Sequence, residues 1–331
     1  MASPYDNIYL IGDSLSDQGN LFQATKTLSG TGSGIPASDH YYSGRFSNGE
    51  VYSGLLAGRL GSTLAATSLG GNNYAYGGTR TNYNIVENPP SSPGYPPGSY
   101  PWTLNLQRQA FVDQNVHDPN ALYVVFSGSN DIADLIGATV RFGDAATQAS
   151  SDLAVQGIRN VIEAYIAAGA QDILVPNLSD LGLVPQVFNR NPPGSHLVSD
   201  TATRITIRFN NALDAMLNEF SNVNIMRFDT FSLLRDVIDN PGAFGLNNAT
   251  MPCYTGFVGP AGPTDTVCTN PESYVFWDIV HPTTALHSIL ANGMLDVINN
   301  NRTVPEPNTF LLLAIGCAGL GLRGKRRIRK E

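Results

Sequence analysis

The amino-acid sequence predicts an α/β domain in which a mostly parallel β-sheet carries helices on both faces. Short, largely apolar runs at residues 8–11, 121–126, 172–176 and 224–228 are typical of buried strands. Segments with helical periodicity lie between these runs, and strands that alternate with helices at this spacing favour parallel pairing. The chain has 331 residues, 42% of them hydrophobic, which is enough for one large domain of this class or two small ones.

The first predicted strand leads into a polar turn. The run Ile8–Ile11 stops at Gly12, and Ser14 follows two residues later. Side chains between residues 13 and 17 offer oxygens for a helix N-cap. A serine at the carboxyl end of a buried strand, beside a helix N-terminus, lies where open α/β sheets bind ligands. An ordinary strand-to-helix turn has the same local sequence, so residues further along the chain must decide between the two.

The remaining elements follow in order along the chain. A helix is expected at about residues 50–60 with Asn48 as its N-cap, and a strand is expected from Asn72 to Arg80 with a tight turn at Gly77 and Gly78. Helical periodicity predicts further helices at about residues 103–115, 144–168, 199–220, 230–239 and 283–299. Residues 240–275 are expected to be irregular.

Residues 88–101 contain six prolines and two glycines, a density that excludes a regular helix or strand. A surface loop beside a binding cleft and a variable insertion without a role both fit this composition. Together with residues 240–275, this segment is the expected source of any substrate selectivity.

The charge of the chain argues against a nucleic-acid partner. The formal net charge is −8, and six of the 19 basic residues lie between residues 323 and 330, so the rest of the chain is more acidic still. Only 14% of the residues are charged, and Asn, Ser and Thr are abundant, which favours an exported protein.

Two of the three cysteines, Cys253 and Cys268, share a loop rich in Gly, Pro and Thr. We expect them to form a disulfide, which would imply an oxidising compartment, and two unrelated thiols are the alternative. Cys317 lies in an apolar segment and is expected to act as a small hydrophobic residue.

The sequence divides into a domain at residues 1–302 and a tail at residues 303–331. The tail contains Pro305-Glu306-Pro307, an uncharged apolar run at residues 310–322 and a strongly basic end. An apolar run followed by basic residues is typical of a membrane stop with its basic end in the cytoplasm, although a full span needs ~20 residues. No secretory leader is visible at Met1, so we expect either that a leader is missing from this chain or that the protein stays inside the cell.

Four short polar blocks fall at the carboxyl ends of predicted strands or beside the sheet. Acyl transfer needs a serine that loses its proton to a base, a carboxylate that orients the base, and N–H donors for the oxyanion. Residues of all these kinds occur in the four blocks, Gly12-Asp13-Ser14-Leu15, Asn73-Tyr74-Ala75-Tyr76-Gly77-Gly78, Gly128-Ser129-Asn130-Asp131 and Trp277-Asp278-Ile279-Val280-His281-Pro282.

Each block also has a structural alternative. Asp278 and His281 are spaced so that the carboxylate reaches one ring nitrogen and leaves the other for a serine, but the same spacing occurs in surface turns. Asn130 offers a side-chain N–H₂ or a helix N-cap. Gly78 offers a backbone N–H for the oxyanion or is a turn glycine, and Gly77 beside it could take the same part.

Together the blocks resemble those of the GDSL or SGNH family of serine esterases and lipases. The first block is Gly-Asp-Ser-Leu itself, and all four occur in the family's order between residue 7 and about residue 300. The family's serine, glycine, asparagine, aspartate and histidine fall on Ser14, Gly78, Asn130, Asp278 and His281. The resemblance implies a flavodoxin-like parallel sheet and hydrolysis of carboxylic esters. It also implies an oxyanion hole made by the N–H groups of Ser14 and Gly78 and the side chain of Asn130.

The tail is similar to the PEP-CTERM sorting signal of Gram-negative bacteria, on the basis of its Pro-Glu-Pro, its apolar run and its basic end. This similarity implies export to the cell surface or beyond, transient anchoring in the inner membrane by residues 310–322, and cleavage by a processing protease. It also makes a missing leader peptide the expected explanation of the N-terminus.

We therefore expect a serine esterase in which Asp278 orients His281, His281 deprotonates Ser14, and an acyl-serine intermediate forms. An inactive surface or matrix binding module on the same fold, and an acyltransferase, remain as alternatives. The substrate is expected to be a small-molecule, lipid or acetylated-polysaccharide ester. No metal or cofactor is expected, because the five histidines lack metal-ligand spacing and no Cys-x-x-Cys, His-Glu-x-x-His or Walker motif occurs.

Overall fold

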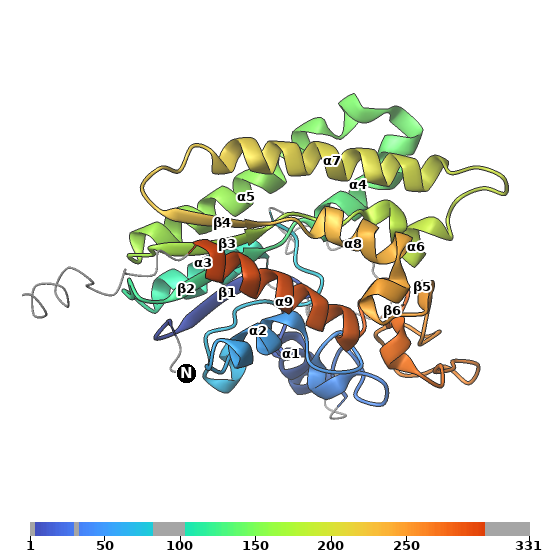
Figure 1. The fold of residues 1–331 in the computed structure, drawn as a ribbon, viewed down its shortest axis with the longest axis horizontal. Helices are drawn as coiled ribbons and strands as arrows, with labels where there is room; N and C mark the ends of the chain where they lie inside the picture. Colours follow the sequence, from blue (N-terminus) through green and yellow to red (C-terminus); the bar gives the residue numbers. More distant parts are fainter. Residues whose placement is uncertain (1–3, 30–32, 82–102, 302–331) are drawn as a thin grey trace, which may run out of the picture.

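The computed structural model describes residues 4–29, 33–81 and 103–301, and its centre is a parallel sheet with the strand order β1-β2-β3-β4 (Figure 1). The strands are β1 (Ile8–Gly12), β2 (Leu122–Phe126), β3 (Asp172–Pro176) and β4 (Asn224–Phe228). Every residue of β1 and β2 is buried, which explains why these strands are continuous apolar runs rather than alternating patterns.

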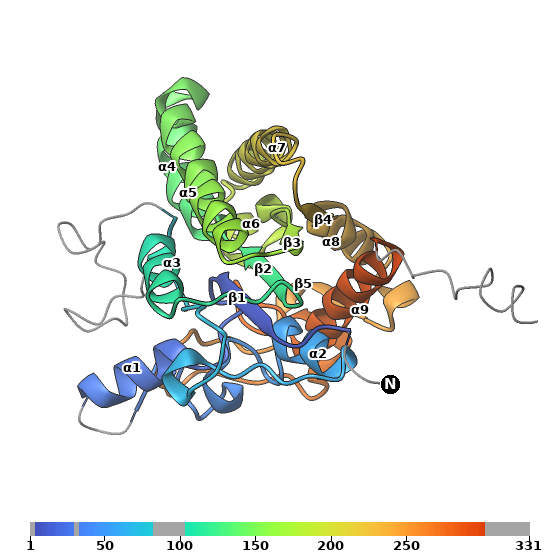
Figure 2. The same ribbon diagram turned by 90° about the vertical axis from the view of Figure 1, so that its left-hand side faces the viewer.

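Helices cover the sheet on both faces. The α-helices of the described residues are α1 (Asn20–Ser29), α2 (Tyr52–Arg59), α3 (Leu104–Asp113), α4 (Ser129–Phe142), α5 (Gln148–Ala167), α6 (Pro185–Phe188), α7 (Leu197–Leu217), α8 (Thr230–Asp239) and α9 (Thr284–Asn301). Helices α3, α5 and α7 lie along one face of the sheet, whereas α2 and α9 lie side by side along the other (Figures 1 and 2). The predicted α/β class, a mostly parallel sheet between two layers of helices, is confirmed.

The prediction of a strand from Asn72 to Arg80 is wrong, because the pairing in this segment is much shorter than expected. Only Asn73 pairs like a strand residue, through parallel bridges to Leu10 of β1 and to Ala66. The backbone turns away after Tyr76, whose N–H still reaches the carbonyl of Gly12 at 3.3 Å. This short pairing occupies the edge beside β1, where a flavodoxin-like sheet with the order 2-1-3-4-5 places its second strand.

Three smaller expectations also differ from the structure. Asn48 does not cap α2, whose N-cap is Val51, because its side-chain oxygen accepts the N–H of Thr284 at the start of α9. Residues 240–275 are not wholly irregular, since β5 (Asn248–Pro252) pairs in parallel with β6 (Tyr274–Phe276). A helix after residue 130 was expected only if Asn130 served as its N-cap, and the structure has such a helix, α4, over Ser129–Phe142.

A second, smaller core packs beside the main one, and we call it the peripheral cluster. It consists of Leu21, Ile35, Tyr41, Phe46, Tyr76, Cys253, Tyr254, Val258 and Trp277. The expected disulfide between Cys253 and Cys268 is present at its edge. The cluster joins the segment before α2 to the segment before α9, two regions more than 200 residues apart in the chain.

In the described part of the chain no helix is both long enough and apolar enough to cross a bilayer. The proline-rich segment 88–101, Cys317 and the apolar run 310–322 all lie outside the described residues.

Candidate active site

The four polar blocks meet at the carboxyl edge of the sheet. Ser14 follows β1, Gly78 follows the bridge at Asn73, Asn130 lies in the first turn of α4 after β2, and His281 precedes α9. All four residues line one cavity of about 490 Å³. The parallel strands bring these blocks together because their carboxyl ends share one edge of the sheet.

Asp278 and His281 form a buried pair beside this cavity. Oδ2 of Asp278 lies 2.8 Å from Nδ1 of His281, and Oδ1 accepts the backbone N–H groups of Val280 and His281 at 2.7 Å each. Burial alone would raise the pKa of Asp278, but the charge and hydrogen bonds of His281, with a hydrogen bond from Tyr41, outweigh it and lower the pKa. Asp278 is therefore an ionised acceptor that fixes the ring of His281.

The imidazole of His281 lies between two aromatic rings. The centroid of the Phe46 ring is 4.9 Å from that of His281, and the Phe257 ring stacks on it at 6.0 Å. Among the described residues Nε2 of His281 has no hydrogen-bond partner. The ring is thus held on three sides while its second nitrogen stays available to a group in the cavity.

Ser14 is almost buried, with 7% of its surface exposed, and it lines the cavity together with His281. No hydrogen bond joins Ser14 to His281 in the described residues, so the two are related by their shared cavity wall. The neighbouring N–H groups of Leu15 and Ser16 both bind Asp13, at 3.1 and 3.0 Å. The N–H of Ser14 is without such a partner within the same residues.

Gly77 and Gly78 differ in a way that the sequence does not reveal. The N–H of Gly77 donates to Oδ2 of Asp17 at 2.9 Å, whereas the N–H of Gly78 has no partner among the described residues. Gly78 has a φ of 75°, in the region that favours glycine, and it lines the cavity. Gly78 is therefore the glycine with a free N–H donor.

Asn130 is not the N-cap of α4, because Gly128 holds that position with a φ of 119°. A side chain at Gly128 would meet the Phe209 ring, since an added Cβ would lie 2.7 Å from its Cζ. Nδ2 of Asn130 donates to the carbonyl of Thr79 at 3.0 Å. An amide nitrogen has two hydrogens. This bond uses one of them and orients the side chain, and the second N–H remains available as a donor.

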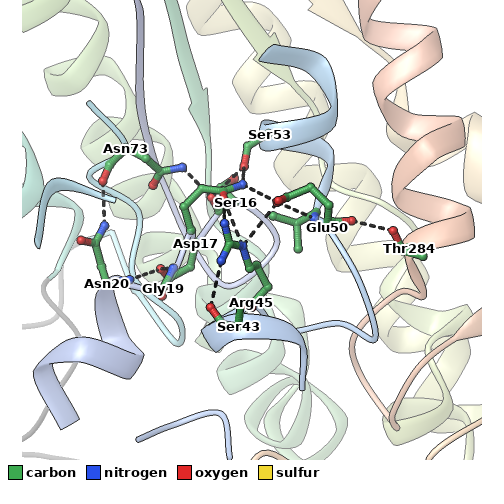
Figure 3. Close-up of polar contacts among 12 residues, drawn as sticks. Ser16, Asp17, Gly19, Asn20, Ser43, Arg45, Glu50, Ser53, Asn73 and Thr284 are labelled. Atoms are coloured by element: carbon green, nitrogen blue, oxygen red, sulfur yellow. Dashed lines mark hydrogen bonds and ion pairs between the residues drawn. The ribbon is translucent and has the colours of Figure 1, made fainter. Parts of the chain in front are cut away.

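A buried polar network fixes the turn after Ser14 to the loop that carries Gly78 (Figure 3). The Asp17 carboxylate accepts the N–H groups of Gly19, Asn20 and Leu21 from its own turn, and the N–H of Gly77 from the loop. Nδ2 of Asn73 donates to the carbonyl of Ser16 at 2.7 Å. Burial raises the pKa of Asp17 to about 6, even though these N–H groups act in the opposite direction.

The outer part of this network reaches the start of α9. Arg45 donates to Oε1 of Gln18 at 2.6 Å and lies 3.4 Å from Oε1 of Glu50 (Figure 3). The hydroxyl of Thr284 donates to the backbone carbonyl of Glu50 at 2.8 Å. The turn that carries Ser14 and the segment that carries His281 are therefore joined through side chains of residues 18–50.

Gln107 is a site residue that the sequence analysis missed. It is fully buried on α3, its Oε1 accepts the N–H of Gly12 at 3.0 Å, and its Nε2 donates to the carbonyl of Gly12 at 2.9 Å. Nε2 also donates to the hydroxyl of Thr79 at 2.8 Å. One side chain thus holds the end of β1 and the residue after Gly78.

Two further titratable groups lie close to the site. Burial raises the pKa of Asp13, which lines the cavity, to about 7. Burial lowers the pKa of His287 to about 3, and neither of its ring nitrogens has a hydrogen-bond partner in the part of the chain that the structure describes. His287 is therefore neutral over the usual working range, and it lacks the carboxylate that orients His281.

Apolar side chains make up most of the cavity wall. They include Leu15, Leu181, Val187, Leu234, Phe276 and Leu290. Within residues 4–29, 33–81 and 103–301, no group of three or more His, Cys, Asp or Glu side chains is arranged to hold a metal ion. The site is therefore a cavity with a mostly apolar wall that Ser14, Asn130 and His281 also line.

Comparison with known proteins identifies the family of the domain and the motif in the tail. The family model for the GDSL-like lipase/acylhydrolase domain matches residues 8–294, and the PEP-CTERM protein-sorting motif matches residues 303–327. The expected export in a Gram-negative bacterium is consistent with that second motif.

Individual relatives are distant but cover most of the chain. A GDSL esterase/lipase of Arabidopsis thaliana is 26% identical over 87% of this chain and 86% of its own. A phosphatidylcholine-sterol acyltransferase of Aeromonas hydrophila is 26% identical over 87% of this chain and 88% of its own. A solved structure from the lipolytic G-D-S-L family, from Veillonella parvula, covers 88% of this chain and 98% of its own at 13% identity, with a TM-score of 0.40. The chain belongs to the GDSL-like lipase/acylhydrolase family and is a serine ester hydrolase of that family with a PEP-CTERM sorting motif at its C-terminus.

Proposed function

We propose that this chain hydrolyses carboxylic esters with Ser14 as nucleophile, His281 as general base and Asp278 as the residue that orients the base. The observation that carries the proposal is the 2.8 Å contact between Asp278 Oδ2 and His281 Nδ1, beside a cavity that both Ser14 and His281 line. A carboxylate on Nδ1 keeps a proton there, so Nε2 is left as the basic nitrogen that faces the serine.

In the first half of the reaction, Ser14 Oγ attacks the ester carbonyl while its proton passes to Nε2 of His281. The charge that develops on the carbonyl oxygen is stabilised by three donors, the N–H of Ser14, the N–H of Gly78 and the second N–H of the Asn130 amide. The protonated His281 then gives its proton to the departing alcohol, and an acyl-serine remains.

In the second half, water loses a proton to His281 and attacks the acyl-serine. The same donors hold the oxyanion, and Ser14 leaves with the proton returned by His281. Asp278 stays ionised throughout, in keeping with its lowered pKa, and stabilises the protonated imidazole in both halves.

The substrate that the cavity favours is an ester with an apolar acyl group. Leucine, valine and phenylalanine side chains are common in the cavity wall and would bury such a chain. Lipid and short-chain esters fit this description better than acetylated polysaccharide, whose bulk is polar. Varying the acyl group of the ester therefore tests this preference.

The first test is hydrolysis of p-nitrophenyl esters from acetate to palmitate by the full chain and by Ser14→Ala. We expect an active parent and a loss of at least about 1000-fold in kcat for Ser14→Ala. Ser150→Ala, on the exposed side of α5, is the matched control and should keep the parent rate. An active, folded Ser14→Ala variant would overturn the proposed nucleophile, and a folded parent inactive on every ester would favour a binding module.

Acyl transfer to an acceptor other than water is the second candidate, because one relative is a phosphatidylcholine-sterol acyltransferase. The same acyl-serine would then react with an alcohol. Adding a sterol or a simple alcohol to the p-nitrophenyl ester assay and analysing the products separates the two, since a transferase forms the new ester in competition with the free acid.

The tail motif supports a further proposal about location. We propose that residues 310–322 hold the exported chain in the inner membrane until a protease cleaves near Pro305-Glu306-Pro307. Fractionation of expressing cells, with the mass of the released protein, tests this. A mature protein that still contains residue 331 would contradict the cleavage.

A further inference from the structure

The phenol of Tyr41 contacts the Asp278–His281 pair from outside the cavity. Oη of Tyr41 lies 2.5 Å from Oδ2 of Asp278, the same oxygen that faces Nδ1 of His281. Tyr41 is 2% exposed and belongs to the peripheral cluster, not to the cavity wall. It reaches the pair from a part of the chain 237 residues away from Asp278.

The direction of this hydrogen bond is fixed by a second contact. The backbone N–H of Val258 donates to the Tyr41 hydroxyl at 3.0 Å, so the single O–H proton of Tyr41 is left for Asp278. An ionised carboxylate is an acceptor only, which agrees with this arrangement. Burial and the nearby charge of Asp278 raise the pKa of the Tyr41 phenol far above its ordinary value, so the proton stays on the phenol.

Tyr41 completes the hydrogen bonds of the Asp278 carboxylate. Oδ1 accepts two backbone N–H groups, and Oδ2 accepts His281 Nδ1 and the Tyr41 hydroxyl. Two bonds on each oxygen prevent rotation of the carboxylate. The bond from Tyr41 also withdraws negative charge from the oxygen that faces His281, and so controls how strongly Asp278 attracts a protonated imidazole.

We propose that Tyr41 is a positioning residue that fixes the orientation and the basicity of Asp278 Oδ2 toward His281. The inference rests on the proposed function, since it gives Tyr41 a role only through that pair. Aromatic rings pack around Tyr41 and hold it in place. The centroid of its ring lies 5.9 Å from that of Tyr254 and 6.4 Å from that of Trp277, both in edge-on geometry.

The decisive variant is Tyr41→Phe in the full chain, assayed on the best p-nitrophenyl ester as a function of pH. Loss of a hydrogen bond to a charged group should lower kcat about 10-fold and change KM less than about twofold. The acid limb of the kcat/KM profile should move to higher pH, because the unshielded carboxylate favours the protonated imidazole more strongly. A purely structural role for Tyr41 would not move this limb.

The other titratable groups that interact with the pair are Asp13 and His287, through His281, and Tyr254, through Asp278, and none of them is changed in this variant. Tyr254→Phe is the matched control. Its hydroxyl lies in the same cluster, 3.4 Å from Asp265, and makes no hydrogen bond to Asp278. Its pH profile should keep the parent shape.

A double-mutant cycle with Asp278→Asn separates action through Asp278 from a general effect. In the Asp278→Asn background, Tyr41→Phe should lower kcat less than twofold instead of about 10-fold. Equal effects in both backgrounds, or an unchanged acid limb in a folded Tyr41→Phe variant, would overturn the inference. If Tyr41→Phe does not fold, ¹³Cζ-tyrosine NMR of the parent and of Asp278→Asn replaces it, and the absence of any shifted tyrosine signal overturns the inference.

The outcomes of the two proposals stay distinct. A Ser14→Ala variant with parent activity refutes the proposed triad and the role of Tyr41 with it. An inactive Ser14→Ala variant combined with a Tyr41→Phe variant of parent rate and parent pH profile refutes only the role of Tyr41.

Discussion

Gln107 pairs with Gly12 through both ends of its side-chain amide, as a neighbouring strand would pair through its backbone. Gly12 is the last residue of β1, two residues before Ser14, so the position of the proposed nucleophile depends on a side chain from α3. The contact comes from a helix on one face of the sheet, 95 residues further along the chain.

Gln107→Leu should therefore lower both stability and rate. The N–H of Gly12 would lose its acceptor while its carbonyl keeps the N–H of Tyr76, so we expect a loss of about 2 kcal/mol in the free energy of unfolding. Urea denaturation and kcat on the best ester measure the two effects. Gln109→Leu, exposed on the same helix, is the control, and equal effects of the two variants would contradict this account.

Asp17→Asn should lower activity although Asp17 does not line the cavity. An amide has one oxygen, so its nitrogen would face two of the four N–H groups that the carboxylate accepts. We expect a loss of about 3 kcal/mol in unfolding free energy and a lower kcat, because the loop of Gly77 and Gly78 is released from the turn of Ser14. Asp152→Asn, which is exposed on α5, should leave both quantities unchanged. A fully active, fully stable Asp17→Asn variant would refute the link.

Asp13→Asn should make the protein less sensitive to pH. The folded pKa of Asp13 is about 7 against 3.8 in the unfolded chain, so the folded state binds more protons between these values and stability falls as pH rises through this window. The variant escapes this loss. The free energy of unfolding of Asp13→Asn minus that of the parent should therefore rise by up to about 4 kcal/mol between pH 3.5 and pH 8.

Urea denaturation of both proteins at pH 3.5, 6 and 8 measures this effect, because the titrating groups that do not interact with Asp13 cancel in the comparison. A difference in unfolding free energy that stays constant with pH would show that Asp13 does not keep its proton in the folded state.

Reducing the disulfide between Cys253 and Cys268 should lower stability and activity together. The bond closes a loop of 15 residues, for which the loss is about 3 kcal/mol. That loop carries Phe257, which stacks on His281, and Val258, which binds Tyr41. Thermal unfolding and ester hydrolysis with and without dithiothreitol measure both effects. The double variant Cys253→Ser/Cys268→Ser should not respond to the reductant, and a parent whose rate ignores it would contradict the coupling.

The sequence was sufficient to predict the sheet because buried parallel strands leave continuous apolar runs. All four strands of the main sheet lie where such runs predicted them. The error at Asn72–Arg80 has a physical cause. Tyr74 and Tyr76 are buried and donate backbone N–H groups to Leu10 and Gly12 of β1, as strand residues would, but only Asn73 forms a bridge and the segment does not continue as a strand.

The proposed site residues were predictable only as members of a recurring set of motifs, since Gly-Asp-Ser or Asp-x-x-His alone fits an ordinary turn. The structure brings Ser14, Gly78, Asn130 and His281 around one cavity. Tyr41 and Gln107 could not be found in this way. Their partners are 237 and 95 residues distant, and no local spacing encodes a contact between elements that meet only after folding.

The cavity is lined by Asp13, Ser14 and Leu15, directly after β1, and by His281, shortly before α9. A nascent chain therefore holds Ser14 long before it holds His281, and the two cannot cooperate until α9 has docked against the sheet. Chains interrupted during synthesis, or with α9 detached, would carry the proposed nucleophile without the proposed base. In this proposal, ester hydrolysis requires that the segment of Ser14 and the segment of His281 are both folded and packed against the same sheet.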